Sequence, residues 1–151
     1  MRIQTVKQQY LGFELPSSTS KEVRRYREQY GAINEALLTM PEVVELAHAD
    51  FCQRLSQSDA GRESRYSSEE ILRSLIVMFV EVADYRDAAV RIENSDFLRG
   101  FVGLGWAKSM MVCSLLAKAF SALSAETWAK MILVVGLHAQ EQGKITGVEV
   151  R

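Results

Sequence analysis

The chain has 151 residues, of which 48% are apolar and 25% are charged, and its formal net charge is −1. These values are typical of one ordinary domain, or of one domain with a helical arm. They count against a strongly basic nucleic-acid binder, so any DNA-facing surface must be local. The polar start lacks the apolar stretch of a signal peptide, and the most apolar segment, residues 71–82, is too short to cross a bilayer. We therefore expect a cytoplasmic protein with no membrane partner.

Residues 1–60 predict an amino-terminal arm of two helices. Thr19 and Glu22 have the spacing of a capping box. The helix that follows carries apolar residues three and four apart, as in a coiled-coil seam: Val23, Tyr26, Tyr30, Ile33, Leu37 and Met40. This seam either packs on the protein's own next helix, which we favour, or pairs two chains as a homodimer. Pro41 suits the first position of the second helix, and the polar residues 56–64 predict a linker.

Residues 61–143 predict a second helical unit. Ser67 and Glu70 form another capping box before residues 71–80, which are apolar nearly all round and should form the central helix. Residues suited to capping then precede each later helix: Asp84, Ser95, Ser114 and Ser124. Residues 144–151 have β character, and a lone strand has no ladder partner, so we expect them to begin a further domain. The predicted fold class is all-α with an orphan β tail.

The segment 114–121 is the candidate recognition helix of a helix-turn-helix. Such a helix needs short polar or basic side chains toward the DNA groove and an apolar back. Ser114, Lys118 and Ser121 would point outward and residues such as Leu116 and Ala119 inward, although an ordinary solvated amphipathic helix looks the same. Phosphate contacts position a protein on the duplex but do not read the base sequence. Five basic residues are candidates for such contacts: Arg62, Arg86, Arg91, Arg99 and Lys108. The alternative for these five is a solvated charged face.

The sequence predicts no metal site, no cofactor and no catalytic residue. His48 and Cys52 lie four residues apart, a spacing that metal ligands use, but no second ligand pair accompanies them. The two cysteines, Cys52 and Cys113, form no CxxC pair, and we expect both to be buried free thiols. No Ser/His/Asp set, phosphate-binding loop or dinucleotide-binding glycine motif occurs.

Six segments in order resemble one family. Residues 61–73 contain GR, then Y, then EEILR, and residues 84–87 read DYRD. Residues 96–105 read DFLRGFVGLG, residues 110–116 MMVCSLL, residues 124–128 SAETW and residues 143–147 GKITG. In this order and spacing they resemble the amino-terminal domain of the DDE insertion-sequence transposases with an InsH-like amino-terminal domain.

The resemblance implies a helix-turn-helix-like domain that recognises the terminal inverted repeats of a transposon in double-stranded DNA. It also implies a following RNase H-like domain whose three carboxylates bind two divalent metals. The first of those carboxylates is expected just beyond residue 151, so DNA binding near the nucleoid, without catalysis, is expected of this chain. Val112 stands where the family usually has Asp, and Ala125 where Pro is common. The alternatives are a protein-interaction module or truncated regulator of full-length transposase, and an unrelated helical transcription regulator.

Overall fold

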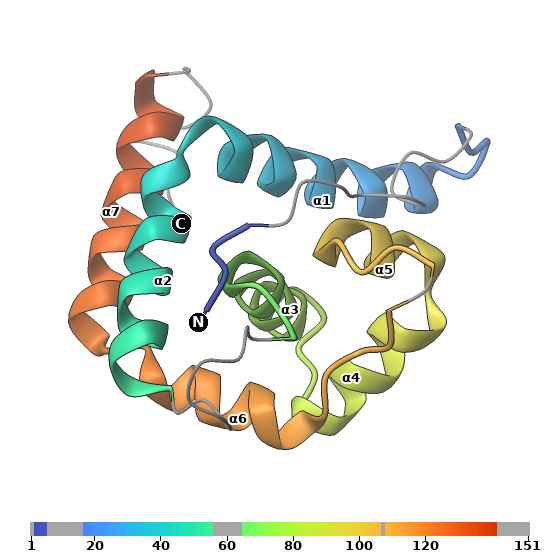
Figure 1. The fold of residues 1–151 in the computed structure, drawn as a ribbon. Helices are drawn as coiled ribbons and strands as arrows, with labels where there is room; N and C mark the ends of the chain where they lie inside the picture. Colours follow the sequence, from blue (N-terminus) through green and yellow to red (C-terminus); the bar gives the residue numbers. More distant parts are fainter. Residues whose placement is uncertain (1, 6–16, 56–64, 107, 142–151) are drawn as a thin grey trace.

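The arrangement is seen in a computed structural model that describes residues 2–5, 17–55, 65–106 and 108–141. Within these residues the helices are α1 (Lys21–Thr39), α2 (Pro41–Arg54), α3 (Ser68–Val80), α4 (Tyr85–Asn94), α5 (Asp96–Val102), α6 (Cys113–Ala122) and α7 (Ala125–Glu141). Figure 1 shows α3 nearly end-on at the centre, with the other helices around it and α7 alongside α2. The described residues contain no strand, so the predicted all-α class is confirmed. The predicted linker 56–64 with Arg62, and the predicted β tail 144–151, lie outside the described residues.

Most helix starts follow from local hydrogen bonding. At α3 the Ser67 hydroxyl accepts from the Glu70 N–H at 3.1 Å, and the Glu70 carboxylate accepts from the Ser67 N–H at 2.9 Å. This predicted capping box is confirmed. Asp84, Ser95 and Ser124 cap α4, α5 and α7 in the predicted way, and Pro41 opens α2.

Two helix starts differ from the prediction. The cap of α1 is Ser20 rather than Thr19, because Ser20 has the extended backbone and its hydroxyl accepts from the Val23 N–H at 3.4 Å. Helix α6 begins at Cys113, so Ser114 lies inside its first turn and cannot cap it. The N-cap position belongs to Val112, whose side chain has no acceptor.

The core is centred on α3. Ile71, Leu72 and Leu75 are at most 1% exposed, because α2, α4, α5 and α6 all pack against this helix. The same cluster of buried residues includes Tyr30 from α1 and Phe51 from α2. The predicted division at residue 60 falls in a segment that is not described, and the helices on either side of it share one core.

The apolar seam of α1 faces this core. Tyr30, Leu37 and Met40 are buried, whereas Val23 and Tyr26 at the start of the helix are each 37% exposed. Ile33 is half-buried. The three buried residues are therefore occupied by the chain's own core and are not available to a second chain in this conformation.

The first residues of the chain complete the start of α3. The backbone carbonyls of Ile3 and Gln4 accept hydrogen bonds from the N–H groups of Ser68, at 2.8 Å, and Glu69, at 3.1 Å. The Thr5 hydroxyl donates to the Glu69 carboxylate at 3.1 Å. The first N–H groups of a helix have no intrahelical partner, so these contacts remove a cost that burial would otherwise impose. The sequence contains no signal for this contact.

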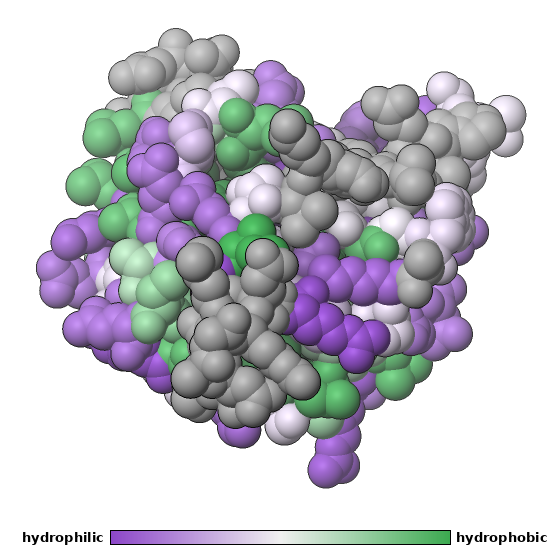
Figure 2. Space-filling model, viewed as in Figure 1, coloured by the Kyte–Doolittle hydropathy of each residue, from purple (hydrophilic) through white to green (hydrophobic). Residues whose placement is uncertain are grey.

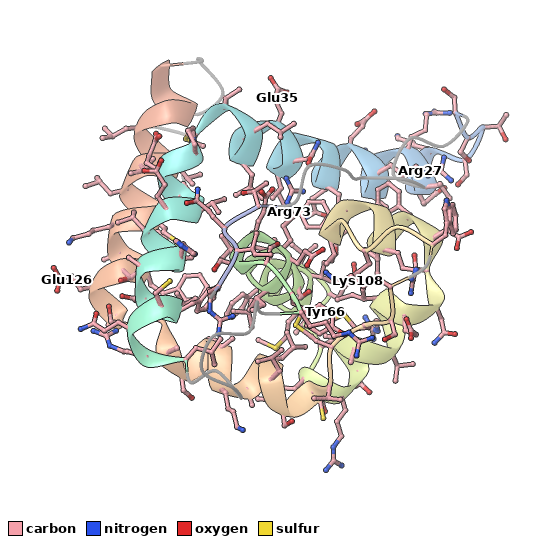
Figure 3. All side chains as sticks on the ribbon, in the orientation of Figure 1. Arg27, Glu35, Tyr66, Arg73, Lys108 and Glu126 are labelled. Carbon is pink, nitrogen blue, oxygen red and sulfur yellow. The ribbon has the colours of Figure 1, made fainter. Side chains whose placement is uncertain are left out.

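Arg73 is a fully buried cation at the middle of the molecule, below α1 in Figure 3. Its guanidinium donates to the Glu69 carboxylate, to the Asn34 side-chain carbonyl and to the Phe101 backbone carbonyl, each at 2.8 Å. It also lies over the Phe101 ring, 5.0 Å from its centroid. One side chain thus connects α1, α3 and α5.

Among the described residues no single helix combines the length and apolarity that crossing a membrane requires. Helices α6 and α7 meet that test only as a pair, by length and composition alone, and they are bent by 85° relative to each other.

Candidate nucleic-acid interface

The outer face of α6 carries the predicted recognition residues. Ser114, Lys118 and Ser121 are exposed, and their spacing of four and three places them on one side of the helix. Leu116 and Ala119 are fully buried on the opposite side. The predicted inward and outward faces of this segment therefore agree with the structure, and the polar face is accessible to a large partner.

A shallow hollow of about 370 Å³ lies beside this face. Its lining comes from α6 and from the end of α2: Arg54, Leu55, Ala117, Lys118, Ser121 and Ala122. The Arg54 guanidinium donates to the Ala122 carbonyl at 3.2 Å, and it lies 3.5 Å from the Asp50 carboxylate. Two cations and a hydroxyl thus border one concave surface, with the charge of Arg54 partly neutralised.

Arg54 was not among the predicted contacts. It ends α2, 64 residues before Lys118, and only the packing of α2 against α6 brings the two side chains together. A basic residue in the last turn of a helix is common, because the helix dipole favours it there. Because this preference alone explains the position of Arg54 in the sequence, the sequence gives no indication that Arg54 has a binding role.

The start of α6 adds a further electrostatic feature. Val112 at the N-cap is 67% exposed and makes no capping hydrogen bond, and the first turn of α6 contains no acidic residue. The positive end of the helix dipole is therefore not balanced by a local carboxylate. Such an end favours an approaching anion.

Two of the predicted phosphate contacts lie on the exposed side of α4, which packs against α6. Arg86 is exposed. Arg91 is also exposed, but its guanidinium lies 3.3 Å from the Glu81 carboxylate. Of these two, Arg86 is the better placed to meet a phosphate, because it has no competing ion pair with any residue that the structure describes.

Arg99 is buried and Lys108 is half-buried, and both are engaged by ion pairs within the chain, so the structure does not favour their predicted role as phosphate contacts. Arg99 is 8% exposed; it donates to the Glu93 carboxylate at 2.5 Å, to the Gly105 carbonyl at 3.1 Å and to the Lys108 carbonyl. These bonds hold the turn after α5, where Gly105 has a φ of 67° that favours glycine.

Lys108 pairs with Glu70, and 26% of its side chain remains exposed. Its ammonium lies 2.7 Å from the Glu70 carboxylate and 4.9 Å from the centroid of the Tyr66 ring. Figure 3 shows Lys108 and Tyr66 close together beside α3. The Tyr66 hydroxyl in turn donates to the Ser109 carbonyl at 2.9 Å. A cation held by a buried carboxylate and a ring in this way has a structural role.

A second polar cluster surrounds Glu81 where α3 ends. Its carboxylate accepts hydrogen bonds from the hydroxyls of Tyr26, at 2.8 Å, and Tyr30, at 2.6 Å, and pairs with Arg91. Burial and the Glu81 charge raise the pKa of Tyr26 to about 12 and raise the pKa of Tyr30 as well. Both tyrosines therefore remain protonated near neutrality, and the cluster joins α1, α3 and α4 without supplying a base.

Among the described residues, the His48 and Cys52 pair has no third ligand. The His48 ring nitrogen Nδ1 lies 2.7 Å from the Ser68 hydroxyl, and Nε2 lies 3.5 Å from the Cys52 sulfur. In the part of the chain that is described, three or more His, Cys, Asp or Glu side chains nowhere gather as a metal site would need. Both cysteines are free, but Cys52 is exposed and Cys113 half-buried, so the predicted burial is wrong for Cys52.

Comparison of this chain with protein-family models, with curated proteins and with solved structures finds no match. The transposase resemblance therefore rests on the sequence motifs alone.

Proposed function

We propose that this chain binds double-stranded DNA through the outer face of α6, as the DNA-recognition part of an insertion-sequence transposase. The observation that carries the proposal is the accessible line of Ser114, Lys118 and Ser121, with Arg54 beside Lys118 at the rim of one hollow. Short hydroxyl side chains and a lysine on one face of a helix suit insertion into a major groove. We propose binding rather than catalysis for these residues, in association with the nucleoid.

The residues divide into two roles. Lys118, Arg54 and Arg86 are cations and would meet phosphates, which position the protein on the duplex. Ser114 and Ser121 would reach base edges, where a hydroxyl both donates and accepts. Because so few cations take part and the net charge is −1, the salt dependence should be moderate. Three phosphate contacts predict a slope of roughly −2.7 in log affinity against log salt.

The test is a titration of fluorescent duplex DNA carrying the inverted repeats that flank the coding sequence, against a scrambled duplex of the same composition. We expect tighter binding to the repeat. Lys118→Ala should weaken binding to both duplexes and reduce the salt slope by about 1. Ser114→Ala and Ser121→Ala should instead reduce the preference between the two duplexes.

The matched control is Lys130→Ala. Lys130 is an exposed lysine on α7, paired with Glu126 on its own helix at 3.1 Å. Its removal should leave binding unchanged. Equal affinity for repeat and scrambled DNA, or an equal loss from Lys118→Ala and Lys130→Ala, would contradict the proposal.

The exposed apolar face of α7 supports a second role, in protein interaction. Ile132, Leu133 and Leu137 are each more than half exposed there. This role is compatible with DNA binding through α6, because the two faces belong to different helices.

A further inference from the structure

The turn after α5 exposes the indole ring of Trp106. Tryptophan is highly buried on average, yet 58% of Trp106 is exposed. Figure 2 shows the exposed apolar side chains of α7 along the left edge of the molecule, whereas the chain between α5 and α6 runs on the other side of α3 in Figure 1. This turn is therefore separate from the apolar face of α7.

Internal hydrogen bonds hold the backbone on both sides of Trp106. Arg99, which is 8% exposed, donates to the backbone carbonyl of Gly105 at 3.1 Å and to that of Lys108. A buried guanidinium thus fixes the residue before Trp106 and a residue shortly after it. An exposed ring on a backbone that is already fixed loses little conformational freedom when it meets a partner, and this is the property of an interface anchor.

A cation lies beside the same stretch of chain. The Arg65 guanidinium donates to the Ser109 hydroxyl at 3.1 Å and lies 5.6 Å from the centroid of the Tyr66 ring. Arg65 is exposed and has no ion pair with any residue that the structure describes. A purely apolar partner would have to take this charge out of water, which is costly, whereas a phosphate pairs with it. A positive charge near an aromatic ring therefore fits nucleic acid, a polyanion with apolar sugar and base surfaces.

The turn also lies within reach of the DNA that α6 is proposed to bind. Trp106 precedes Val112, the N-cap residue of α6, by six positions. An extended chain spans at most about 3.6 Å per residue, so the Cα atoms of these two residues lie within about 22 Å of each other. One turn of duplex DNA is about 34 Å long. Part of a duplex that α6 enters must therefore lie within one helical turn of Trp106.

We propose that Trp106 and Arg65 form a second DNA contact beside α6. The indole ring packs against the sugar and base surface that flanks the groove entered by α6, and the guanidinium pairs with a backbone phosphate. This inference rests on the proposed function, because α6 must first bind the duplex. It adds a fourth phosphate contact to the three already assigned, so the slope of log affinity against log salt becomes roughly −3.6 rather than −2.7.

The first test uses the fluorescence of the two tryptophans of the chain, Trp106 and Trp128. In Trp128→Phe only Trp106 remains, and saturating duplex with the inverted repeats should reduce its quenching by acrylamide roughly twofold, because a desolvated contact excludes the quencher. In the matched control, Trp106→Phe, only Trp128 remains. Trp128 is half-buried, 5.4 Å from the Phe79 ring centroid, and its quenching should not change.

The second test measures affinity. Trp106→Ala should weaken binding to the repeat about tenfold, as the loss of an interface anchor does. Leu38→Ala is the matched control, because Leu38 on α1 is also 58% exposed, and it should leave the affinity unchanged. Arg65→Gln should return the salt slope to roughly −2.7, whereas Arg25→Gln, at an exposed position of α1, should not change the slope.

The outcomes separate this contact from the proposed function. A wild-type chain that bound no duplex would overturn the proposed function, and the second contact with it. If the wild type bound the repeat but Trp106→Ala bound it equally tightly, or if DNA left the quenching of Trp106 unchanged, only the second contact would be overturned. An equal loss from Leu38→Ala would also overturn it. Both Trp106 and Arg65 are exposed, so their variants should keep the circular dichroism spectrum of the wild type.

Discussion

The carboxylate of Asp50 on α2 accepts a hydrogen bond from the backbone N–H of Ser124 at 3.0 Å, although the two residues are 74 positions apart. Ser124 is the residue that caps α7, and its hydroxyl accepts from the Thr127 N–H at 3.0 Å. A nearly buried carboxylate thus links α2 to the start of α7.

Asp50 should make stability depend on acid pH. Burial alone would raise the pKa of Asp50, but hydrogen bonds from Thr127 and Ser124 and the charge of Arg54 outweigh it and lower the pKa. The unfolded carboxyl titrates near about 3.9, so the contribution to stability is complete above that pH and is lost as the pH falls through the lower folded value. Asp50→Asn should remove this dependence and cost about 1.5–3 kcal/mol at pH 7.

Urea unfolding of the wild type and Asp50→Asn at several pH values measures this difference. Glu126→Gln is the control, because the Glu126 side chain is 77% exposed in its ion pair with Lys130 and points away from the molecule in Figure 3. Such a surface pair contributes about 0–1 kcal/mol. Equal effects of the two substitutions would contradict the assigned role of Asp50.

Replacement of Arg73 should be strongly destabilising. Arg73→Met keeps much of the side-chain volume but leaves the Glu69 carboxylate buried without its cation. Removing one partner of a buried pair costs about 3–5 kcal/mol. Arg25→Met, at an exposed position of α1, should change stability by less than about 0.5 kcal/mol. Thermal and urea unfolding compare the two, and a loss below about 1 kcal/mol for Arg73→Met would contradict the structural role.

The two tyrosines that contact Glu81 should lose their protons at a higher pH than a free tyrosine does. A free tyrosine loses its proton near pH 10, whereas the pKa of Tyr26 is about 12. The folded protein therefore holds the proton while the unfolded chain releases it, and stability falls as pH rises through this window. Glu81→Gln should move part of the tyrosinate absorbance to lower pH. Glu28→Gln, exposed on α1, should leave the titration curve in place.

Val82 should be a site of backbone strain. It lies in the turn after α3 with a φ of 51°, and 91% of it is exposed, so no packing compensates the strain. A β-branched residue in this region is a rare outlier, and the left-handed conformation costs about 1–2 kcal/mol. Val82→Gly should raise the unfolding free energy by about 0.5–1 kcal/mol, after the entropy of glycine in the unfolded chain is deducted.

Val90→Gly is the same substitution at another position, and it should lower the unfolding free energy instead of raising it. Val90 lies inside α4, where glycine is less favourable than valine by about 0.3–0.5 kcal/mol. If both substitutions destabilised the protein equally in urea unfolding, Val82 would not be strained.

Replacing Val112 with a residue whose side chain accepts a hydrogen bond should stabilise the start of α6. The Val112 backbone is extended, with φ −69° and ψ 151°, as a capping residue requires, but valine has no acceptor. Both Val112→Asp and Val112→Ser should stabilise the protein by about 1 kcal/mol. Only the aspartate places a negative charge at the start of α6, so only Val112→Asp should also weaken DNA binding. If the two variants bound DNA with equal affinity, the start of α6 would not lie near the DNA in the complex.

Local features of this protein follow from short stretches of its sequence. The caps at Ser67, Asp84, Ser95 and Ser124 depend on residues within about one turn of each other. The nearly continuous apolar residues of α3 indicate a central helix. Even here the caps at Ser20 and Val112 differ from the predicted Thr19 and Ser114, because residues one or two positions apart compete for each helix start.

Which charged side chains face solvent depends on how distant segments of the chain pack together. Lys108 is 38 residues from Glu70, and the Arg54 guanidinium meets a carbonyl 68 residues away, so no local pattern distinguishes a buried pair from an exposed cation. The same holds for α7, whose apolar side chains predict burial but whose covering elements depend on how the other helices pack against it. Hydrogen bonds within a turn follow from sequence spacing, whereas contacts between distant segments depend on how all the helices pack together.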